Sequence, residues 1–279
     1  MAVSIVTNVA SLGAQRHLNR TQTRIAGNIN RLSSGLRINR ASDDAAGLAI
    51  SEKLKAQIRS LSQASRNAND GVSLTQVAEG AMDQMQGIVE RMRELAIQSA
   101  NGTLGSTERG FIQTEFNELR SEIDRISAVT EFNGQKLLDG SASAGLTMQV
   151  GINNTANDRV TIKITKLAAG TLGSTTKLSA ASLSTATKAQ AAIAVFDKAI
   201  SQLSDARAKL GAAQNRLTVT MDNLSVAHEN LSAANSRIRD VDVAEETAAF
   251  TRNQILSQAG VSVLAQANQM PSVALSLLG

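Results

Sequence analysis

The side chains that could support catalysis are few and widely separated. The chain has no cysteine, and its only histidines, His17 and His228, lie near opposite ends of the sequence. Neither belongs to an HExxH motif or to a recognisable nucleophile–base arrangement. The run GTLGSTTK at residues 170–177 lacks the Gly-Lys-Ser/Thr ending of a phosphate-binding loop. We therefore expect no enzymatic activity and no cofactor.

A cluster of acids near the C-terminal end is the one pattern typical of a cation site. The run RDVDVAEE at residues 239–246 supplies Asp240, Asp242, Glu245 and Glu246. Its spacing does not match an EF-hand loop, and it contains no glycine to make the turn. We expect a solvated connector that pairs with arginines, namely Arg37, Arg237 or Arg239, and no bound metal.

A second polar connector interrupts the N-terminal part, at RLSSGLRINRASDDAAGLAIS, residues 31–51. Helical apolar periodicity precedes and follows this stretch, whereas within it glycine weakens the helix and aspartates offer a new N-cap. The sequence predicts a joint between two helices rather than an active site. The joint residues are Gly35, Arg37, Asn39, Arg40, Ser42, Asp43 and Asp44.

The two chain ends carry apolar residues at helical spacing, with arginine the only charged residue type in the first end and no charge in the last part of the second. In residues 1–36 the predicted stripe is Leu18, Ile25, Ile29 and Leu32, and no side chain beyond Arg252 is charged. Soluble monomers avoid long exposed apolar stripes, and a helix lying on a membrane surface carries Lys or Arg on its polar face. We therefore expect these ends to pair as helices in a self-assembled bundle. The C-terminal stripe residues are Ile255, Leu264, Leu275, Leu277 and Leu278.

Composition favours long, closely packed helices. The 279 residues include no Trp or Tyr, five Phe and a single proline, Pro271, so little interrupts a helix. The predicted fold is mostly α and elongated: a long-helix bundle with a small β-hairpin, and paired N- and C-terminal helices forming a coiled-coil-like inner domain.

The middle of the chain is predicted to fold as a helical rod. Helical periods run from about residue 44 to 100, again from about 107 to 126, and from 189 onward. Alternation at about 146–164 predicts the hairpin, and the Ser/Thr/Ala/Gly-rich residues 165–188 predict a short surface crossing. The predicted domains are therefore residues 1–41 with 240–279, residues 42–164 with 189–239, and the crossing.

Charge suggests a rival function. Residues 1–42 contain six arginines and no acid, as a lipid- or nucleic-acid-binding helix would. No aromatic residues are interleaved with these arginines, so we expect them to be solvated or to bridge neighbouring chains, with neither nucleic acid nor membrane as partner. No window is apolar enough to span a bilayer, and the N-terminus lacks the basic and apolar regions of a signal peptide.

Several long runs resemble bacterial flagellin, the subunit of the flagellar filament. They are LSSGLRINRASDDAAGLAIS (32–51), NANDGVSLTQVAEGAM (67–82), RMRELAIQSANGT (91–103), TEFNGQKLLDG (130–140) and the segment from Asn223 to the last residue. The resemblance implies a structural subunit that polymerises into a helical filament for swimming motility. The short crossing makes the chain similar to a minimal flagellin without the large variable outer domains.

The resemblance also implies partners and a location. It implies an extracellular flagellum reached through the flagellar secretion channel without a cleaved signal peptide. Partners would be other copies of the chain, the flagellar export chaperone and export apparatus, and the filament cap and hook-associated proteins. Host Toll-like receptor 5 is a further implied partner, through Arg91, Leu95 and Glu115. A hook–filament junction protein of the same export system is the alternative within this structural class.

Overall fold

The computed structural model describes residues 7–173 and 176–276, with side chains described as far as residue 270. Over these ranges the chain is mostly α-helical, as predicted, with five α-helices and two small antiparallel hairpins. It divides into two compact units, Met1–Ile58 with Glu229–Gly279, and Arg59–His228. Two helices, α2 (Ala45–Ala100) and α4 (Ala186–Arg239), contribute to both units.

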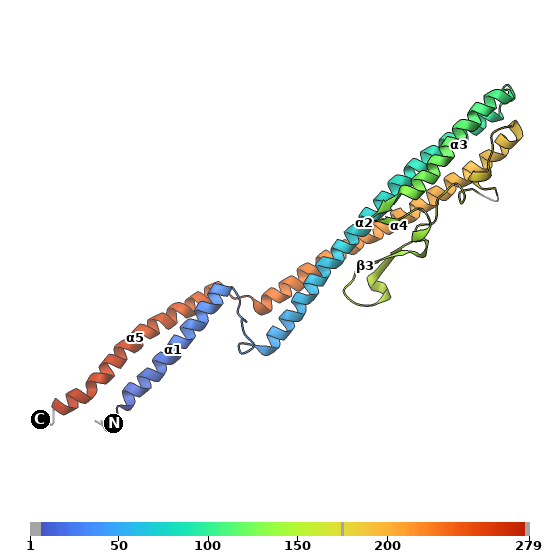
Figure 1. The fold of residues 1–279 in the computed structure, drawn as a ribbon. Helices are drawn as coiled ribbons and strands as arrows, with labels where there is room; N and C mark the ends of the chain where they lie inside the picture. Colours follow the sequence, from blue (N-terminus) through green and yellow to red (C-terminus); the bar gives the residue numbers. More distant parts are fainter. Residues whose placement is uncertain (1–6, 174–175, 277–279) are drawn as a thin grey trace. The chain divides into compact units, whose positions relative to one another are not determined.

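The first unit is built on two terminal helices, α1 (Val9–Ser34) and α5 (Val243–Ser276), which lie side by side (Figure 1). They run antiparallel, because the Asn8 side chain donates to the Ala267 carbonyl while Leu36 pairs with Asp240 at the other end. The pairing of the two chain ends predicted from their uncharged stripes is therefore present. The first turns of α2 and the last turns of α4 complete this unit.

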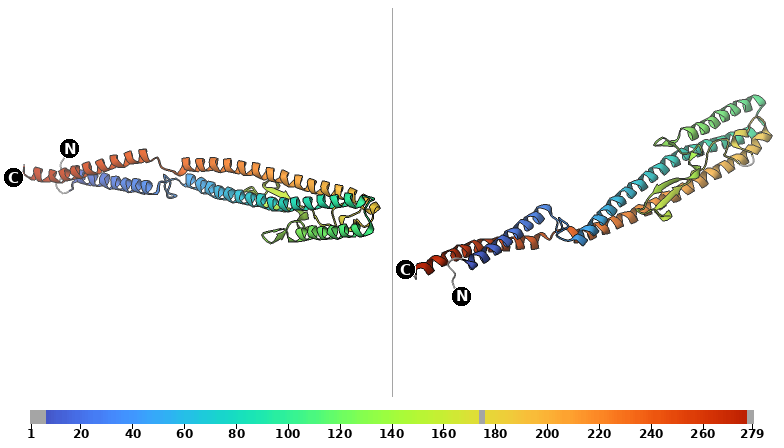
Figure 2. Two further views of the ribbon diagram at one scale, coloured as in Figure 1. Left: turned by 90° about the horizontal axis from the view of Figure 1, so that it is seen from above. Right: turned by 60° about the horizontal axis from the view of Figure 1, so that its bottom comes forward.

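The second unit packs α2, α3 (Ser106–Val129) and α4 along one another (Figure 2). Its core consists mainly of Leu, Ile, Met and Ala, with Phe116 and Phe196 in a tilted ring contact of 5.9 Å between centroids. The buried face of α2 is broad: Ala78, Met82 and Val89 are fully buried, whereas Val77 is 41% exposed. The buried face of α2 is broad because several elements pack around this helix in one core.

Two hairpins contribute to the core of the second unit. The predicted one pairs β3 (Leu146–Gln149) with β4 (Arg159–Ile162), with Leu146 opposite Ile162. A shorter one pairs β1 (Glu131–Phe132) with β2 (Gln135–Lys136) and was not predicted. Its two loop residues, Asn133 and Gly134, both have positive φ, at 49° and 76°. This is the Asn-Gly turn that matches the twist of paired strands.

The segment 165–188 is more deeply packed than the surface crossing expected from its composition. Its apolar side chains are buried in the core, and polar groups of the helices hold its backbone. The amide of Gln202 both accepts from and donates to the Gly173 backbone, at 2.9 Å each. Asp124 accepts from the Ala169 amide, and Ser99 donates to the Leu183 carbonyl. Composition alone missed this because scattered leucines without a period can still fill a core. The buried leucines are Leu167, Leu172, Leu178 and Leu183.

Candidate self-assembly surface and its joint

The N-terminal joint is a hydrogen-bonded connector between α1 and α2. Gly35 ends α1 in the left-handed conformation, with φ 70°, and its amide donates to the Arg31 carbonyl at 2.8 Å. The Asp43 carboxylate accepts from the amides of Asn39 and Arg40 at 3.1 and 2.9 Å. These two backbone donors hold the pKa of Asp43 below its ordinary value.

The aspartate next in sequence begins the following helix. Asp44 accepts from the Gly47 amide at 2.8 Å and so acts as the expected N-cap of α2. Ser42, between the cap and the turn, is exposed. The predicted joint residues therefore do lie in one connector, whose conformation is set mainly by hydrogen bonds between side chains and backbone.

The two connectors of the first unit are bonded to each other. The Arg37 amide donates to the Arg239 carbonyl at 2.7 Å, and the Val241 amide donates to the Gly35 carbonyl at 3.0 Å. The Arg37 guanidinium also donates to the Ile238 carbonyl at 2.6 Å. Residues 35–37 and 239–241 thus form a short antiparallel bridge that joins the end of α1 to the end of α4.

The acids of residues 240–246 do not make the arginine pairs expected of them. Arg239 pairs with Glu52, and Asp242 accepts from the Ala244 amide at 2.9 Å as a cap of α5. Glu246 turns toward α1 and lies 3.5 Å from Arg31. Asp242 thus has a local backbone partner and Glu246 a cross-helix partner, and the linear sequence reveals neither. In the described residues no group of three or more His, Asp or Glu is placed to hold a metal.

One face of α1 packs on α5, but not all of the predicted stripe belongs to it. Leu18, Ile25 and Leu32, spaced by heptads, are half-buried, and Leu18 approaches Gly260. Ile29 is 50% exposed and so lies off the seam between α1 and α5. A seven-residue repeat keeps positions on one seam, whereas Ile29 lies away from it. On α5 the same division appears: Leu264 is half-buried and Ile255 is 61% exposed.

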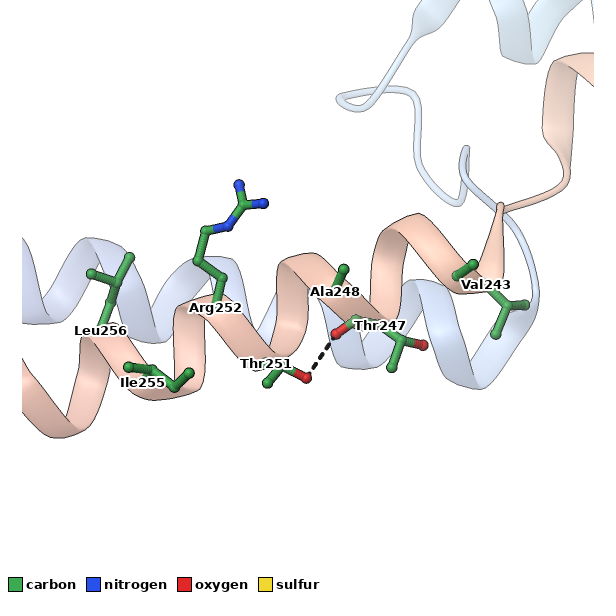
Figure 3. A pocket seen from close by; sticks show the side chains of 8 residues that line it. Val243, Thr247, Ala248, Thr251, Arg252, Ile255 and Leu256 are labelled. Atoms are coloured by element: carbon green, nitrogen blue, oxygen red, sulfur yellow. Dashed lines mark hydrogen bonds between the residues drawn. The ribbon is translucent and has the colours of Figure 1, made fainter.

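The outer face of α5 is a shallow apolar surface (Figure 3). Thr247, Thr251 and Ile255 lie on the side of α5 away from the α1 ribbon, and Val243 and Leu256 complete the lining, with Arg252 the one charged group among the lining residues. Farther along the helix, large aliphatic side chains remain about half exposed. A monomer gains nothing from such exposure, so the geometry supports contact with another apolar surface. These side chains are Val261, Val263 and Met270.

The extreme C-terminal leucines fall at or beyond the limit of description. Leu275 lies in the last turns of α5, and nothing is described of its side chain, while Leu277 and Leu278 lie outside the described residues. Within the described part of the chain, no helix combines the length and hydropathy needed to cross a bilayer.

A separate exposed cluster lies where α2 faces α3. The Arg91 guanidinium contacts Glu115 at 2.9 Å and Glu94 at 3.0 Å. The hydrogen bonds that Arg91 donates, first to Glu94 and then to Glu115, raise the pKa of Arg91. Leu95, expected to share this surface, is only 1% exposed because it faces the core. Of the three residues implied by the resemblance, Arg91 and Glu115 alone present an accessible polar pair.

Comparison with known proteins identifies the family. The model of the bacterial flagellin N-terminal helical region matches residues 5–143, and that of the C-terminal helical region matches residues 193–278. The chain belongs to the bacterial flagellin family. Its similarity to individual flagellins spans nearly the full length. A flagellin of Halalkalibacterium halodurans is 48% identical, covering 97% of this chain and 98% of the relative. A flagellin of Bacillus subtilis strain 168 is 46% identical over the same shares.

A solved structure described as a flagellar hook-associated protein from Vibrio parahaemolyticus has a similar fold. It aligns with a TM-score of 0.59 at 14% identity and covers 71% of this flagellin and 100% of that chain. The likeness shows that both chains share the helical architecture. The family follows instead from the flagellin sequence matches.

Membership of the family settles the function at the level of the filament. The protein is a structural subunit of the bacterial flagellar filament, serves swimming motility and is not an enzyme. Its short length fits a flagellin without a large variable domain.

The structure adds one residue to the seam between α1 and α5 that sequence reasoning missed. Asn28 is buried between α1 and α5, where it meets Glu246 and Asn253. The heptad that runs through Leu18, Ile25 and Leu32 also contains Asn28, so its period held a signal for this position. A stripe defined only by its apolar residues does not include this polar position.

Proposed function

We propose that burial of the outer face of α5 drives polymerisation of this flagellin, together with the exposed apolar residues of α1. The observation that supports it is the row of exposed aliphatic side chains on an α5 surface whose last charged residue is Arg252. Removing a large aliphatic side chain from water contributes about 1.5–3 kcal/mol, so a few such contacts per subunit suffice for association. On α1 the exposed aliphatic residues are Val9, Leu12 and Ile29.

The proposal assigns different roles to different parts of the chain. Residues 1–41 and 240–279 would form the inner filament core and become ordered only as subunits assemble. Residues 42–164 and 189–239 would form the rod that sets the position of each subunit, with residues 165–188 in place of variable outer domains. The half-buried, largely small or polar contacts between α1 and α5 support this division, because such a seam is weak in isolation. When identical subunits associate through a contact whose repetition does not close into a ring, they build an open helical filament.

Partners beyond the filament follow from the family and are part of the proposal. We infer export through the flagellar secretion channel without a cleaved signal peptide, assisted by the export chaperone acting on the C-terminal segment. The filament cap and hook-associated proteins would then receive the subunit. For Toll-like receptor 5 we propose Arg91 and Glu115 as contacts, with Leu95 supporting the α2 face from the core. Arg91→Ala should weaken binding of the receptor ectodomain, whereas Arg125→Ala, which breaks a similar exposed pair with Glu122, should not.

Seeded assembly tests the main proposal. Purified chain is added to sheared filament fragments, and growth is followed by electron microscopy for the parent, Ile255→Glu and Gln254→Glu. Both variants add one negative charge to the exposed side of α5, but only Ile255→Glu removes apolar surface. We expect growth of the parent and the Gln254→Glu control, and loss of growth for Ile255→Glu.

The other outcomes are informative. Equal growth of all three chains would contradict a driving role for this face. A parent that ignores filament seeds but extends hook complexes would favour the junction-protein alternative. Salt-sensitive binding of the parent to DNA or anionic vesicles would favour the arginine-rich segment of residues 16–40 as a binding surface.

A further inference from the structure

The contact surface between α1 and α5 is unusually poor in large apolar side chains. Apart from three half-buried aliphatic residues on α1, and Phe250 and Leu264 on α5, the positions in this seam are small or polar on both helices. Such positions can pair in more than one alignment, because small side chains fit equally well one heptad away. The α1 positions are Ser11, Ala14 and Thr21; the α5 positions are Ala249, Ser257, Gly260 and Ala267.

One layer in this seam is different. Asn28 is 6% exposed, its amide nitrogen donates to a Glu246 carboxylate oxygen at 2.6 Å, and its amide oxygen accepts from Asn253 at 3.0 Å. Arg31 lies 3.5 Å from the same Glu246 oxygen. The Glu246 side chain is 12% exposed, so this is a nearly enclosed polar layer in which both ends of the Asn28 amide are used.

The layer discriminates between alignments. If α5 slid by one heptad toward one end, Glu246 would face the level of Ile25, and if it slid the other way, Asn253 would face the level of Leu32. Glu246 and Asn253 are themselves one heptad apart, so either shift puts one of them in the other's place and leaves Asn28 with one partner instead of two. One end of the Asn28 amide then stays unpaired in an enclosed setting, which is costly. A shift of seven residues displaces one helix along the other by about 10 Å at 1.5 Å per residue.

We propose that Asn28, Glu246, Asn253 and Arg31 form a register layer that fixes how far α1 and α5 are displaced along each other. The four residues act as positioning residues: by fixing the alignment of α1 and α5, they determine which exposed apolar side chains of the two helices lie next to each other. The bridge at residues 35–37 and 239–241 restrains the same alignment from the joint, and the layer extends that control into the helices. The proposal rests on the proposed assembly, since the outer faces matter only when subunits associate.

The absence of cysteine allows register to be read by cross-linking. Leu18→Cys with Gly260→Cys reports the observed alignment, because a side chain added at Gly260 would come within 3.5 Å of Leu18. Leu18→Cys with Ala267→Cys reports a shift of one heptad, and Ser11→Cys with Gly260→Cys reports the opposite shift. Each pair is placed in the full chain, assembled into filaments and oxidised. Gel mobility separates disulfides within one chain from those between chains.

The decisive comparison replaces the whole layer. In the parent background we expect only the Leu18–Gly260 pair to form. With Asn28→Leu, Glu246→Leu and Asn253→Leu combined, we expect both shifted pairs to form as well and the native cross-link to fall several-fold. Asn30→Leu, an exposed neighbour of Asn28 on α1, is the matched control and should leave the parent pattern unchanged. Glu246→Gln keeps the Asn28 hydrogen bond and should also retain the parent pattern.

The outcomes separate this proposal from the one before it. A triple variant that gives only the native cross-link overturns the register layer, even if filaments form normally. If that variant does not assemble alone, it is diluted into an excess of cysteine-free parent. A purely native pattern there overturns the proposal in the same way, whereas shifted pairs support it. Failure of the parent to assemble contradicts the proposed function instead.

Discussion

Gly47, in the first turn of α2, is a residue whose missing side chain matters. A Cβ at this position would lie 2.4 Å from the Asp44 carboxylate and 2.7 Å from the buried Ile38 side chain. Gly47→Ala should therefore displace the cap, which contributes about 1 kcal/mol, and open the start of α2. Hydrogen exchange of residues 45–58 should accelerate about fivefold, since 1.4 kcal/mol corresponds to tenfold.

The matched control is Gly80→Ala in the same helix. A Cβ there meets nothing within 4 Å, and alanine is favoured over glycine in a helix interior by about 0.5–1 kcal/mol. Exchange in the middle of α2 should slow. If both variants behaved alike, the close approach of Asp44 to Gly47 would have no energetic role.

Asp43 gives the joint a dependence on pH. Its pKa is lowered first by the Arg40 amide and then by the Asn39 amide, so folding favours its charged form. The stabilisation is present above the unfolded value of about 3.9 and is lost as the pH falls through the lower folded value. We expect protection of these two amides from hydrogen exchange to hold at neutral pH and to fall below about pH 4. Asp43→Asn should weaken protection at neutral pH and remove the acid step, while Asp222→Asn in α4 should retain both.

At the scale of the elements, α3 has one aromatic face in the core and one in solvent. Phe116 is fully buried against Phe196, whereas Phe111, five residues earlier in the same helix, is 72% exposed. Phe116→Ala should lower the free energy of unfolding by about 3–5 kcal/mol through lost contacts and a cavity. Phe111→Ala should change it by about 0.5 kcal/mol or less. Urea denaturation of both variants tests this, and equal effects would contradict the packing of α3.

Sequence alone predicted the elements better than their contacts. Long runs with a 3.6-residue period gave the extents of α2 and α4, and strict alternation gave β3 and β4, because each signal is repeated many times. The β1–β2 hairpin has two residues per strand, too few for any period, and only its Asn-Gly turn could have revealed it. The burial of residues 165–188 depends on partners such as Gln202 that lie in a different element.

The assembly site was predicted in the same uneven way. That the chain ends pair was visible from their apolar stripes, yet the stripe did not reveal that Ile29 lies off the seam, and Asn28 was missed. A stripe defined by apolar residues cannot include a polar residue whose partners, Glu246 and Asn253, lie more than two hundred positions away. Leu95 is the opposite case. Its motif predicted a surface contact, but a sequence motif does not indicate whether a side chain is buried, and Leu95 lies in the core.

At the scale of the whole molecule, the distribution of charge predicts how assembly responds to salts. Beyond Arg252 no residue is charged, while the exposed positions of α5 are aliphatic or small and polar. Screening by sodium chloride should therefore have little effect on contacts made by this face, since screening acts on charge pairs. Sulfate, which strengthens apolar burial by exclusion from protein surfaces, should accelerate seeded growth at equal ionic strength.

The same comparison separates apolar assembly from a mechanism based on the arginines of residues 16–40. Contacts between arginines and acids of neighbouring subunits would weaken as either salt is raised, and the two salts would act alike at equal ionic strength. Growth rates by light scattering, measured in matched chloride and sulfate series, distinguish these cases. A chain with Ile255 and Val263 both changed to Ser should lose the sulfate response, because two exposed aliphatic groups have been removed without any change in charge. If its response matched the parent's, the apolar face of α5 would not be the surface on which sulfate acts, and the driving contact would have to lie elsewhere in the chain.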